Sequence, residues 1–293
     1  MCFLKDDNIE KVRRQLQRCV NIYNNTFSFN RLDIKDRKII ESNAEFKEKY
    51  KGKRCFIIGN GPSINKVDFK KLNKELVITV NGMILHDRFC DLNSDFHFLA
   101  DPVYFKLNKN IEGDKEIIQK MNVLSHTNTK LFMPIQGIRS TKVYGWYKCI
   151  DIRYFASKLY FYDNYKESID FAKYIPAFQG VIHWGIAFAL YMGCKEIYLL
   201  GCDATNMIAS FSLLKDKEAG LEYAYDLSND AAILAKKRNC DLGLEYLLYG
   251  YWRIVHIFSE LFYYCKRNGV KLINCSEESI LESIPKQKLE NIL

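Results

Sequence analysis

Six short apolar segments along the chain have the length and composition of buried β-strands. Each is four or five residues long and is bounded by turn residues or by a segment with helical spacing. The six segments are 55–58, 76–80, 96–100, 130–134, 196–200 and 270–274. Longer helical segments, 181–193 and 252–267, separate the last of them. Strands that alternate with helices predict a mostly parallel sheet with helices on both faces, which is an α/β, Rossmann-like fold.

The first fifty residues follow a helical pattern instead. Within this segment, apolar residues recur at helical spacing at Ile9, Val12, Leu16, Cys19 and Val20. We therefore predict a helical extension over residues 1–50 and a main nucleotide-binding domain over residues 51–293. Charged residues begin at Lys5, which is too early for a signal peptide.

Two segments, 140–178 and 204–250, do not fit the alternation of strands and helices. The first is rich in Tyr, Phe and Trp, and the second mixes polar residues with tyrosines such as Tyr223 and Tyr225. In a doubly wound sheet, the segments that follow the carboxyl ends of strands border the ligand crevice. We interpret both as insertions that form a lid or bind an acceptor. The alternative is that their aromatic residues simply pack a helical subdomain.

Composition and charge narrow the class of protein. The chain has 293 residues, is 48% hydrophobic and 27% charged, and carries a net charge of +8. No apolar run reaches the roughly 18–20 residues of a membrane span. The ten cysteines are scattered and include no CxxC pair, which predicts reduced thiols in the cytoplasm. The positive charge fits an anionic substrate or peripheral contact with an acidic inner membrane surface, whereas interleaved charges over 35–54 disfavour nucleic acid.

A glycine-rich turn follows the first predicted strand, with the sequence GNGPS. Gly59 and Gly61 allow the positive φ and the close approach of a tight turn. Pro62 suits the first position of a helix, and Ser63 with the free amides of the first turn can then bind an anion. Asn60 adds a side chain with both a donor and an acceptor. The segment therefore predicts a phosphate-binding turn.

The turn departs from two common nucleotide-binding motifs. A dinucleotide fingerprint needs a third glycine, where Ile64 stands, and an acidic residue after the second strand, where Asn81 stands. A P-loop needs a lysine that the turn lacks. The chain also contains no Asp-x-Asp, the carboxylate pair that holds a metal ion against a nucleotide diphosphate. These departures favour a sugar donor with a monophosphate leaving group, which amides and hydroxyls can stabilise without metal.

Three segments resemble a known family. IIGNGPSINKVDFKKL, the pair Val80-Asn81 and GVIHWGIAFALYMGCKEIYLLGCD are similar to the bacterial lipooligosaccharide sialyltransferases and to the broader set of 6-hydroxymethylpterin diphosphokinase-like proteins. The resemblance covers residues 53–103 and 176–282. It implies a site for the cytidine monophosphate of an activated sugar at Asn60, Gly61, Pro62, Ser63, Asn81, Gln179 and Gly180. Asp101 falls where the family places an Asn near the donor, and Asp203 lies in GCDAT, where the family carries GIDFY.

The family's catalytic base is a His in a short motif before the last helix, and this chain lacks that motif. The corresponding stretch, LLYGYWRIVHIF, has aromatic residues there and His256 about one helical turn further on. We expect His256 to be the base and His183 to be the second candidate. A carboxylate, Asp101 or Asp203, could replace them if burial raised its pKa.

The sequence thus predicts a metal-independent, inverting glycosyltransferase of bacterial surface-glycan biosynthesis. Its donor would be a CMP-activated acidic sugar, sialic acid or a related nonulosonic acid, and its acceptor a glycan or glycolipid. We expect no cofactor and no metal. Two alternatives stay open at this point: a pterin pyrophosphokinase that uses ATP, with Asp101 and Asp203 as magnesium ligands, and a nucleotide-binding protein without catalysis.

Overall fold

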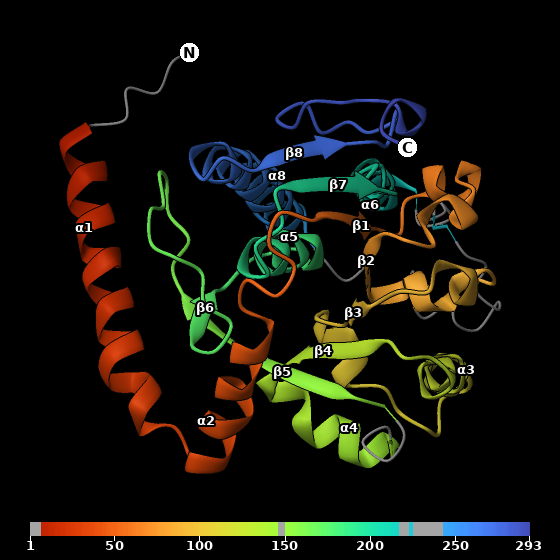
Figure 1. The fold of residues 1–293 in the computed structure, drawn as a ribbon, viewed down its shortest axis with the longest axis horizontal. Helices are drawn as coiled ribbons and strands as arrows, with labels where there is room; N and C mark the ends of the chain where they lie inside the picture. Colours follow the sequence, from red (N-terminus) through yellow and green to blue (C-terminus); the bar gives the residue numbers. More distant parts are fainter. Residues whose placement is uncertain (1–6, 146–149, 217–222, 225–242) are drawn as a thin grey trace.

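The computed structural model describes residues 7–145, 150–216, 223–224 and 243–293 (Figure 1). Among these residues the chain forms one eight-stranded sheet in which every neighbouring pair of strands is parallel. The strands are β1 (Arg54–Ile58), β2 (Leu76–Val80), β3 (Phe96–Phe98), β4 (Lys130–Pro134), β5 (Ile152–Leu159), β6 (Tyr174–Pro176), β7 (Glu196–Leu200) and β8 (Lys271–Asn274). The predicted α/β fold is confirmed.

The order of the strands creates a switch point in the middle of the sheet. The order is β6-β5-β4-β3-β2-β1-β7-β8, so the chain builds outward from β1 to one edge and then returns to place β7 on the other side of β1. The loops that follow β1 and β7 therefore leave neighbouring strands at the same end of the sheet. In open α/β sheets, ligands bind at this place.

The six predicted strands all form, and two more were not predicted. β5 and β6 lie within 140–178, and they extend the sheet from β4 to its edge. In β5, IRYFASKL, charged residues interrupt the continuous apolar run that is typical of a central strand, and β6, YIP, is only three residues long. The helix α4 (Ile138–Tyr144) precedes them.

Different elements cover the two faces of the sheet. On one face, α5 (Val181–Tyr191) and α8 (Leu244–Arg267) pack over the strands, together with Phe46. On the other face lie α3 (Glu112–Met121) and several short 3₁₀ helices. α5 is apolar all round because it is buried between the sheet and α8. Within the described residues, the 3₁₀ helices are Phe29–Arg31, Ser42–Phe46, Pro62–Lys66, Phe69–Leu72, Asn81–Leu85, Phe89–Leu92, Pro102–Phe105, Asn122–His126, Ile135–Gly137 and Leu289–Asn291.

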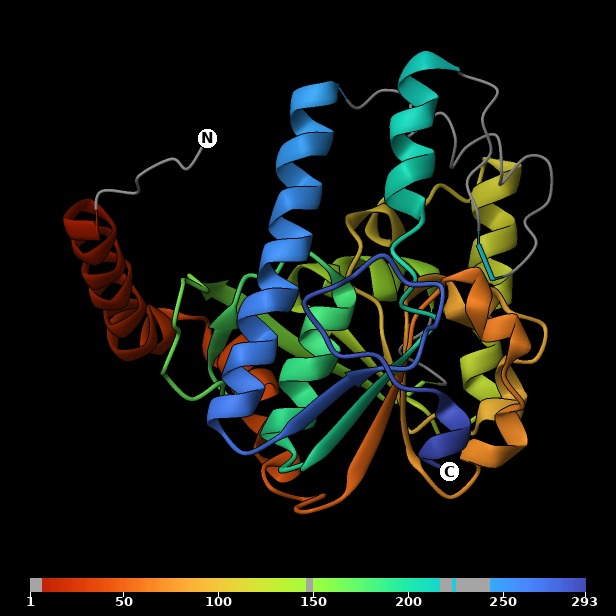
Figure 2. The same cartoon turned by 90° about the horizontal axis from the view of Figure 1, so that it is seen from above.

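Two helices project beyond the carboxyl ends of the strands. α8 begins eight residues before the predicted start of its helix at 252, and its first half stands beside α6 (Asn206–Lys215) (Figure 2). α6 belongs to the segment 204–250, of which 217–222 and 225–242, including Tyr225, lie outside the described residues. No helix in the described part of the chain is long and apolar enough to cross a membrane.

The N-terminal residues are helical, but they join the main domain before residue 50. α1 (Asp7–Tyr23) continues through a π-helical turn (Asn24–Ser28), and α2 (Ile34–Glu41) follows. The side-chain amide of Asn43 donates to the carbonyls of Tyr154, at 2.8 Å, and Phe171, at 3.1 Å. The ring of Phe46 is fully buried in the core. Only α1 therefore stands apart, along one side of the molecule in Figure 1.

Candidate functional site

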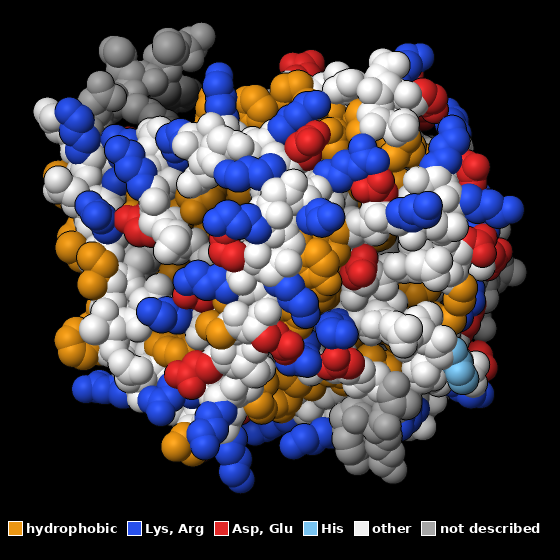
Figure 3. Space-filling model, viewed as in Figure 1, with side chains coloured by type: hydrophobic (Ala, Val, Ile, Leu, Met, Phe, Trp, Pro, Cys, Tyr) orange, Lys and Arg blue, Asp and Glu red, His pale blue; other side chains and the backbone are white. Residues whose placement is uncertain are grey.

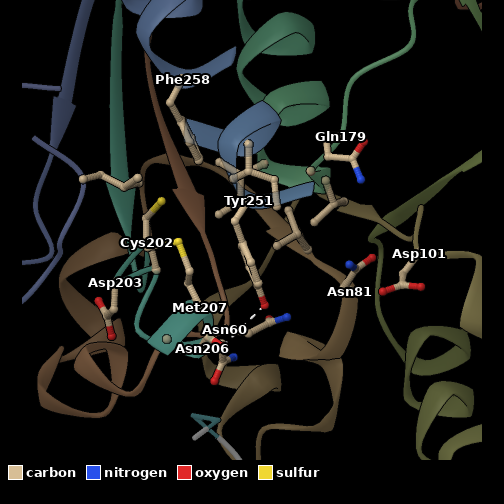
Figure 4. A pocket seen from close by; sticks show the side chains of 18 of the residues that line it. Asn60, Asn81, Asp101, Gln179, Cys202, Asp203, Asn206, Met207, Tyr251 and Phe258 are labelled. Atoms are coloured by element: carbon tan, nitrogen blue, oxygen red, sulfur yellow. Dashed lines mark hydrogen bonds between the residues drawn. The ribbon is translucent and has the colours of Figure 1, made fainter. Parts of the chain in front are cut away.

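A pocket of about 590 Å³ opens at the switch point of the sheet. The ends of β1, β2, β3 and β7 form its floor, and the start of α5 with parts of α6 and α8 forms its walls (Figure 4). Its volume lies in the usual range for small-molecule sites. Seven residues predicted from the sequence line it: Asn60, Gly61, Asn81, Asp101, Gln179, Gly180 and Asp203. Gly59, Pro62, Ser63, His183 and His256 are not among the lining residues.

The glycine turn brings two loops together. A Cβ on Gly59 would lie 2.5 Å from the carbonyl oxygen of Gly201, and a Cβ on Gly61 would lie 2.4 Å from the carboxylate of Asp203. The amides of Gly59 and Gly61 donate to the carbonyls of Leu200 and Gly201. Neither Gly59 nor Gly61 has a positive φ, contrary to our expectation; Gly201 does, at 61°. Glycine is therefore needed at both positions because a larger side chain would collide with the loop that follows β7.

Ser63 is already paired with an anion of the protein itself. Its backbone N–H donates to Oδ2 of Asp203 at 2.8 Å, and its hydroxyl donates to Oδ1 of the same carboxylate. Asp203 is 1% exposed. The helix that begins at Pro62 is a 3₁₀ helix of only five residues. The donors that we assigned to a phosphate thus hold the Asp203 carboxylate, which fixes the two loops of the switch point.

Asn81 forms the turn at the end of β2. It has a left-handed backbone conformation, with φ 42°, which Asn tolerates better than most residues. Its side-chain oxygen accepts the N–H of Ala100 at 3.1 Å and so ties this turn to the end of β3. His97 supports the turn from β3: the ring is fully buried, and Nδ1 lies 2.9 Å from the hydroxyl of Thr79.

Two amide side chains of the pocket wall hold unpaired acceptors. The side-chain oxygens of Asn60 and Asn206 are buried and have no hydrogen-bond partner. Both residues line the pocket, Asn60 from the loop after β1 and Asn206 from the start of α6. A buried polar atom without a partner costs about 1–3 kcal/mol. A ligand with N–H or O–H donors would remove this cost.

The start of α5 offers the pocket a set of donors. Gln179, Gly180, Val181 and Ile182 line the wall where this 11-residue helix begins. The first amides of a helix have no partner within the helix, and the helix dipole makes this end attractive to anions. Among the described lining residues there is no Lys, Arg or His. Backbone amides and neutral side chains therefore provide the donors for an anionic ligand here.

His183 lies beneath the pocket wall. Its Nδ1 accepts the N–H of Gly180 at 3.1 Å, which caps α5, and its ring packs against Phe258 with 4.3 Å between centroids. Burial lowers the pKa of His183 to about 3, against a smaller opposing effect of the Ile254 backbone. The side chain is therefore neutral at physiological pH and holds the start of α5 in place.

His256 faces away from the pocket, on the side of α8 next to the loop that carries Asp163. Its Nε2 lies 2.8 Å from the Asp163 carboxylate, and its ring stacks on Trp252 at 4.9 Å between centroids. Glu260 lies one turn further along α8, and donor atoms of Asp163, His256 and Glu260 lie within 4.8 Å of one another. Val255, the residue before His256, does line the pocket. The described pocket thus contains neither predicted base.

Tyrosines near the pocket were not assigned from the sequence. Tyr251 lines the wall (Figure 4), and its hydroxyl lies 2.7 Å from that of Ser210 on α6. Burial raises the pKa of Tyr223 to about 12, with smaller contributions from Asp101 and Tyr251. Asp101 is exposed and uses Oδ1 to accept the N–H of Val103 at 3.0 Å. The helical spacing of residues 251, 254, 255 and 258 could have indicated from the sequence that Tyr251 shares one face of α8 with other lining residues.

Buried neutral histidines predict that the protein loses stability in mild acid. The pKa of His97 and that of His183 are both lowered to about 3 from 6.5, chiefly by burial. Between these values the unfolded chain binds protons that the folded chain does not. The free energy of unfolding should therefore fall below about pH 6.5, by up to ~1.4 kcal/mol per pH unit for each histidine.

His183→Asn, which keeps an acceptor for Gly180, should reduce this slope in urea titrations between about pH 6.5 and pH 4.5. The matched control is the same substitution, His to Asn, at the exposed His126. An unchanged slope in the His183 variant would mean that this side chain is protonated equally in both states.

The chain belongs to the 6-hydroxymethylpterin diphosphokinase MptE-like family, whose model matches residues 33–207. Comparison with curated proteins found no match. Solved structures with a similar course of the chain include the sialyltransferase CstII from Campylobacter jejuni in complex with cytidine-5'-monophosphate, at 18% identity and a TM-score of 0.41, covering 80% of this chain and 85% of that one.

The monofunctional alpha-2,3-sialyltransferase Cst-I from Campylobacter jejuni is also similar, at 15% identity and a TM-score of 0.43, covering 80% of each chain. Similarities this distant assign no ligand, reaction or residue role to the present protein. The family match includes the glycine turn, Asn81, Asp101 and the start of α5, so most of the pocket floor lies within it.

Proposed function

We propose that this protein is a metal-independent, inverting glycosyltransferase whose donor is a CMP-activated acidic sugar. The observation that carries the proposal is the chemistry of the pocket: amides, hydroxyls and a helix start line it, with two carboxylates and no cationic side chain among the described lining residues. Such a lining suits a donor of low charge. A nucleoside monophosphate bears less charge than a triphosphate and can be held by neutral donors.

The parts of the donor match the parts of the pocket. The phosphate would lie at the start of α5, where Val181 and Ile182 offer backbone amides and the helix dipole favours an anion. The amino group of cytosine or the hydroxyls of ribose would donate to the unpaired oxygens of Asn60 and Asn206. Pro62 and Ser63 have only an indirect part in this proposal, because Ser63 already holds Asp203.

A pterin pyrophosphokinase is the second candidate, and the family match favours it. Transfer of diphosphate from ATP needs bound magnesium and therefore carboxylates free to bind it. Asp203 accepts two hydrogen bonds from Ser63, which leaves Asp101 as the other carboxylate of the described lining. The three-donor group around His256 does not line the pocket. The carboxylates available in the pocket therefore fit ATP with magnesium less well than the pocket's neutral hydrogen-bond donors fit CMP.

We assign the general base to Asp101, although it is exposed and burial therefore does not favour its neutral form, because Asp203 is held by Ser63 and neither His256 nor His183 is among the described lining residues. In the proposed step an acceptor hydroxyl attacks the anomeric carbon of the sugar from the face opposite the phosphate. The new C–O bond forms, the bond to the phosphate oxygen breaks, and CMP leaves with the electron pair. The proton of the hydroxyl passes to the carboxylate of Asp101.

The acceptor would be a glycan or glycolipid of bacterial surface-glycan biosynthesis in the cytoplasm, including one at the inner membrane surface. Support comes from aromatic side chains on the projecting half of α8. Tyr246, Tyr249 and Trp252 are each more than half exposed, and Tyr246 also lines the pocket. Exposed aromatic faces are suitable platforms for sugar rings because they combine apolar area with a polar edge.

Asp101→Asn tests the reaction. We expect CMP release from CMP-activated sialic acid in the presence of acceptor to fall by ~10²-fold or more, with donor affinity nearly unchanged, because only the proton acceptor is lost. His256→Ala is the comparison and should retain wild-type turnover. Retained turnover in Asp101→Asn together with lost turnover in His256→Ala would identify His256 as the general base instead. Unchanged turnover in both would remove this proton transfer from the proposal.

A further inference from the structure

α1 turns its polar side toward the body of the protein and its apolar side outward. Asn21 is 4% exposed, and its amide pairs with the backbone of Tyr160 in both directions, at 2.9 and 2.8 Å. Arg18 pairs with Glu167 at 3.0 Å. By contrast, six large apolar side chains of the same helix are exposed by 42–65%; one of them, Ile22, lies apart, and the other five share one face of the helix: Ile9, Val12, Leu16, Val20 and Tyr23. We call these five residues the α1 stripe; hydrophobic side chains lie along this edge in Figure 3.

The α1 stripe is narrow, and its spacing is symmetrical. Successive members are separated by three, four, four and three residues, so the pattern reads the same in both directions about Leu16. At ~100° per residue, all five lie within an arc of about 80°. An apolar arc of this width is typical of a helix–helix seam. A palindromic spacing is what two antiparallel copies of one helix need in order to match across a two-fold axis.

The charges of α1 fit a second helix better than a lipid surface. A helix that lies on a membrane carries Lys and Arg on either side of a broad apolar face. Here the neighbours of the α1 stripe on the helical wheel include Asn8, Gln15 and Gln17, whereas Lys11 and Arg18 lie on the far side. Arg13 borders the stripe but pairs with Glu10 at 3.2 Å.

We infer that the α1 stripe binds a second copy of this chain, antiparallel and across a two-fold axis at Leu16. Leu16 then meets Leu16 of the second copy, Val12 meets Val20, and Ile9 meets Tyr23. The same symmetry places Arg13 opposite Cys19 of the second copy, so like charges do not meet. A groove of about 570 Å³ lies along the α1 stripe and is bordered by Tyr160, so side chains of the second helix can enter it.

Sedimentation velocity of the full chain tests this inference. We expect a dimer at micromolar concentration and at least ~100-fold weaker association for Leu16→Glu, which places two buried charges at the axis. Lys11→Glu introduces the same charge on the far side of α1 and should leave the dimer intact. Both positions are exposed in the single chain, so neither change should alter its fold or melting temperature.

Cross-linking locates the axis independently. In a Cys19→Ser background, Leu16→Cys should form a disulfide-linked dimer on mild oxidation, whereas Lys11→Cys should not. A wild-type chain that sediments as a monomer, or a Leu16→Glu variant that dimerises like the wild type, would overturn the inference. Flotation with vesicles of anionic lipid separates the main competitor: a monomer that binds them and loses binding in Leu16→Glu would assign the α1 stripe to a membrane surface instead.

Discussion

Asn60→Ala is expected to weaken nucleotide binding by roughly 10- to 100-fold while leaving the free protein at least as stable as the wild type. Asn60 lies in the loop after β1, where its side chain reaches the pocket and its buried oxygen has no partner. Removal of that oxygen takes away the acceptor to which an N–H or O–H group of the bound nucleotide would donate. It also removes an unpaired buried atom, so the free energy of unfolding should not fall.

The control for this substitution is the same change at another buried asparagine, Asn43. The amide of Asn43 donates to two backbone carbonyls far from the pocket, so Asn43→Ala should lower the melting temperature and retain nucleotide binding. Thermal shift with and without nucleotide measures both properties in one experiment. Wild-type affinity in Asn60→Ala would remove this residue from the site, and a large loss of stability would show that its amide has a structural partner.

Gly59→Ala should destabilise the protein by about 3 kcal/mol or more, because the new methyl group has no room. It would lie 2.5 Å from the carbonyl oxygen of Gly201 and 3.0 Å from a methyl group of Ile182. The first of these atoms belongs to the backbone, which is held by the hydrogen bonds of β1 and β7. The loop after β7 would have to move, and the pocket floor would move with it.

Gly250→Ala is the matched control for this substitution. Gly250 lies within α8 with no atom within 4 Å of its added Cβ, so Ala should be neutral or stabilise the helix by about 0.5–1 kcal/mol. Urea denaturation gives both values. A loss of less than about 1 kcal/mol in Gly59→Ala would contradict the close contact of the two loops.

The central part of the fold could be predicted from the sequence because it depends on patterns of residues that are close together along the chain. The strands β1, β2 and β7 are continuous apolar runs, and GNGPS marks the turn after β1. β5 was missed because charged residues interrupt its apolar pattern, and β6 was missed because it is an edge strand of only three residues. The first residues of α8 were missed because they are apolar on exposed as well as buried positions, which hides the period of the helix.

The chemistry of the site was less readable because it depends on tertiary contacts. Ser63 and Asp203 are separated by 140 positions, and only the strand order of the sheet brings them together. The side of a helix on which a histidine lies depends on what packs against that helix. His183 faces Phe258, and His256 faces Asp163. Spacing alone could place both histidines near the pocket, but it could not say which way they point.

If the pocket holds a cytidine monophosphate donor without metal, binding should depend on the base and not on magnesium. Isothermal titration of the wild-type chain with CMP, CTP and ATP, each in EDTA and in magnesium, measures this. We expect binding of the cytidine nucleotides that is unchanged by magnesium, because neutral donors hold the phosphate, and weaker binding of ATP under both conditions. Binding of ATP only with magnesium, together with no binding of CMP or CTP, would contradict the claim and favour the pyrophosphokinase.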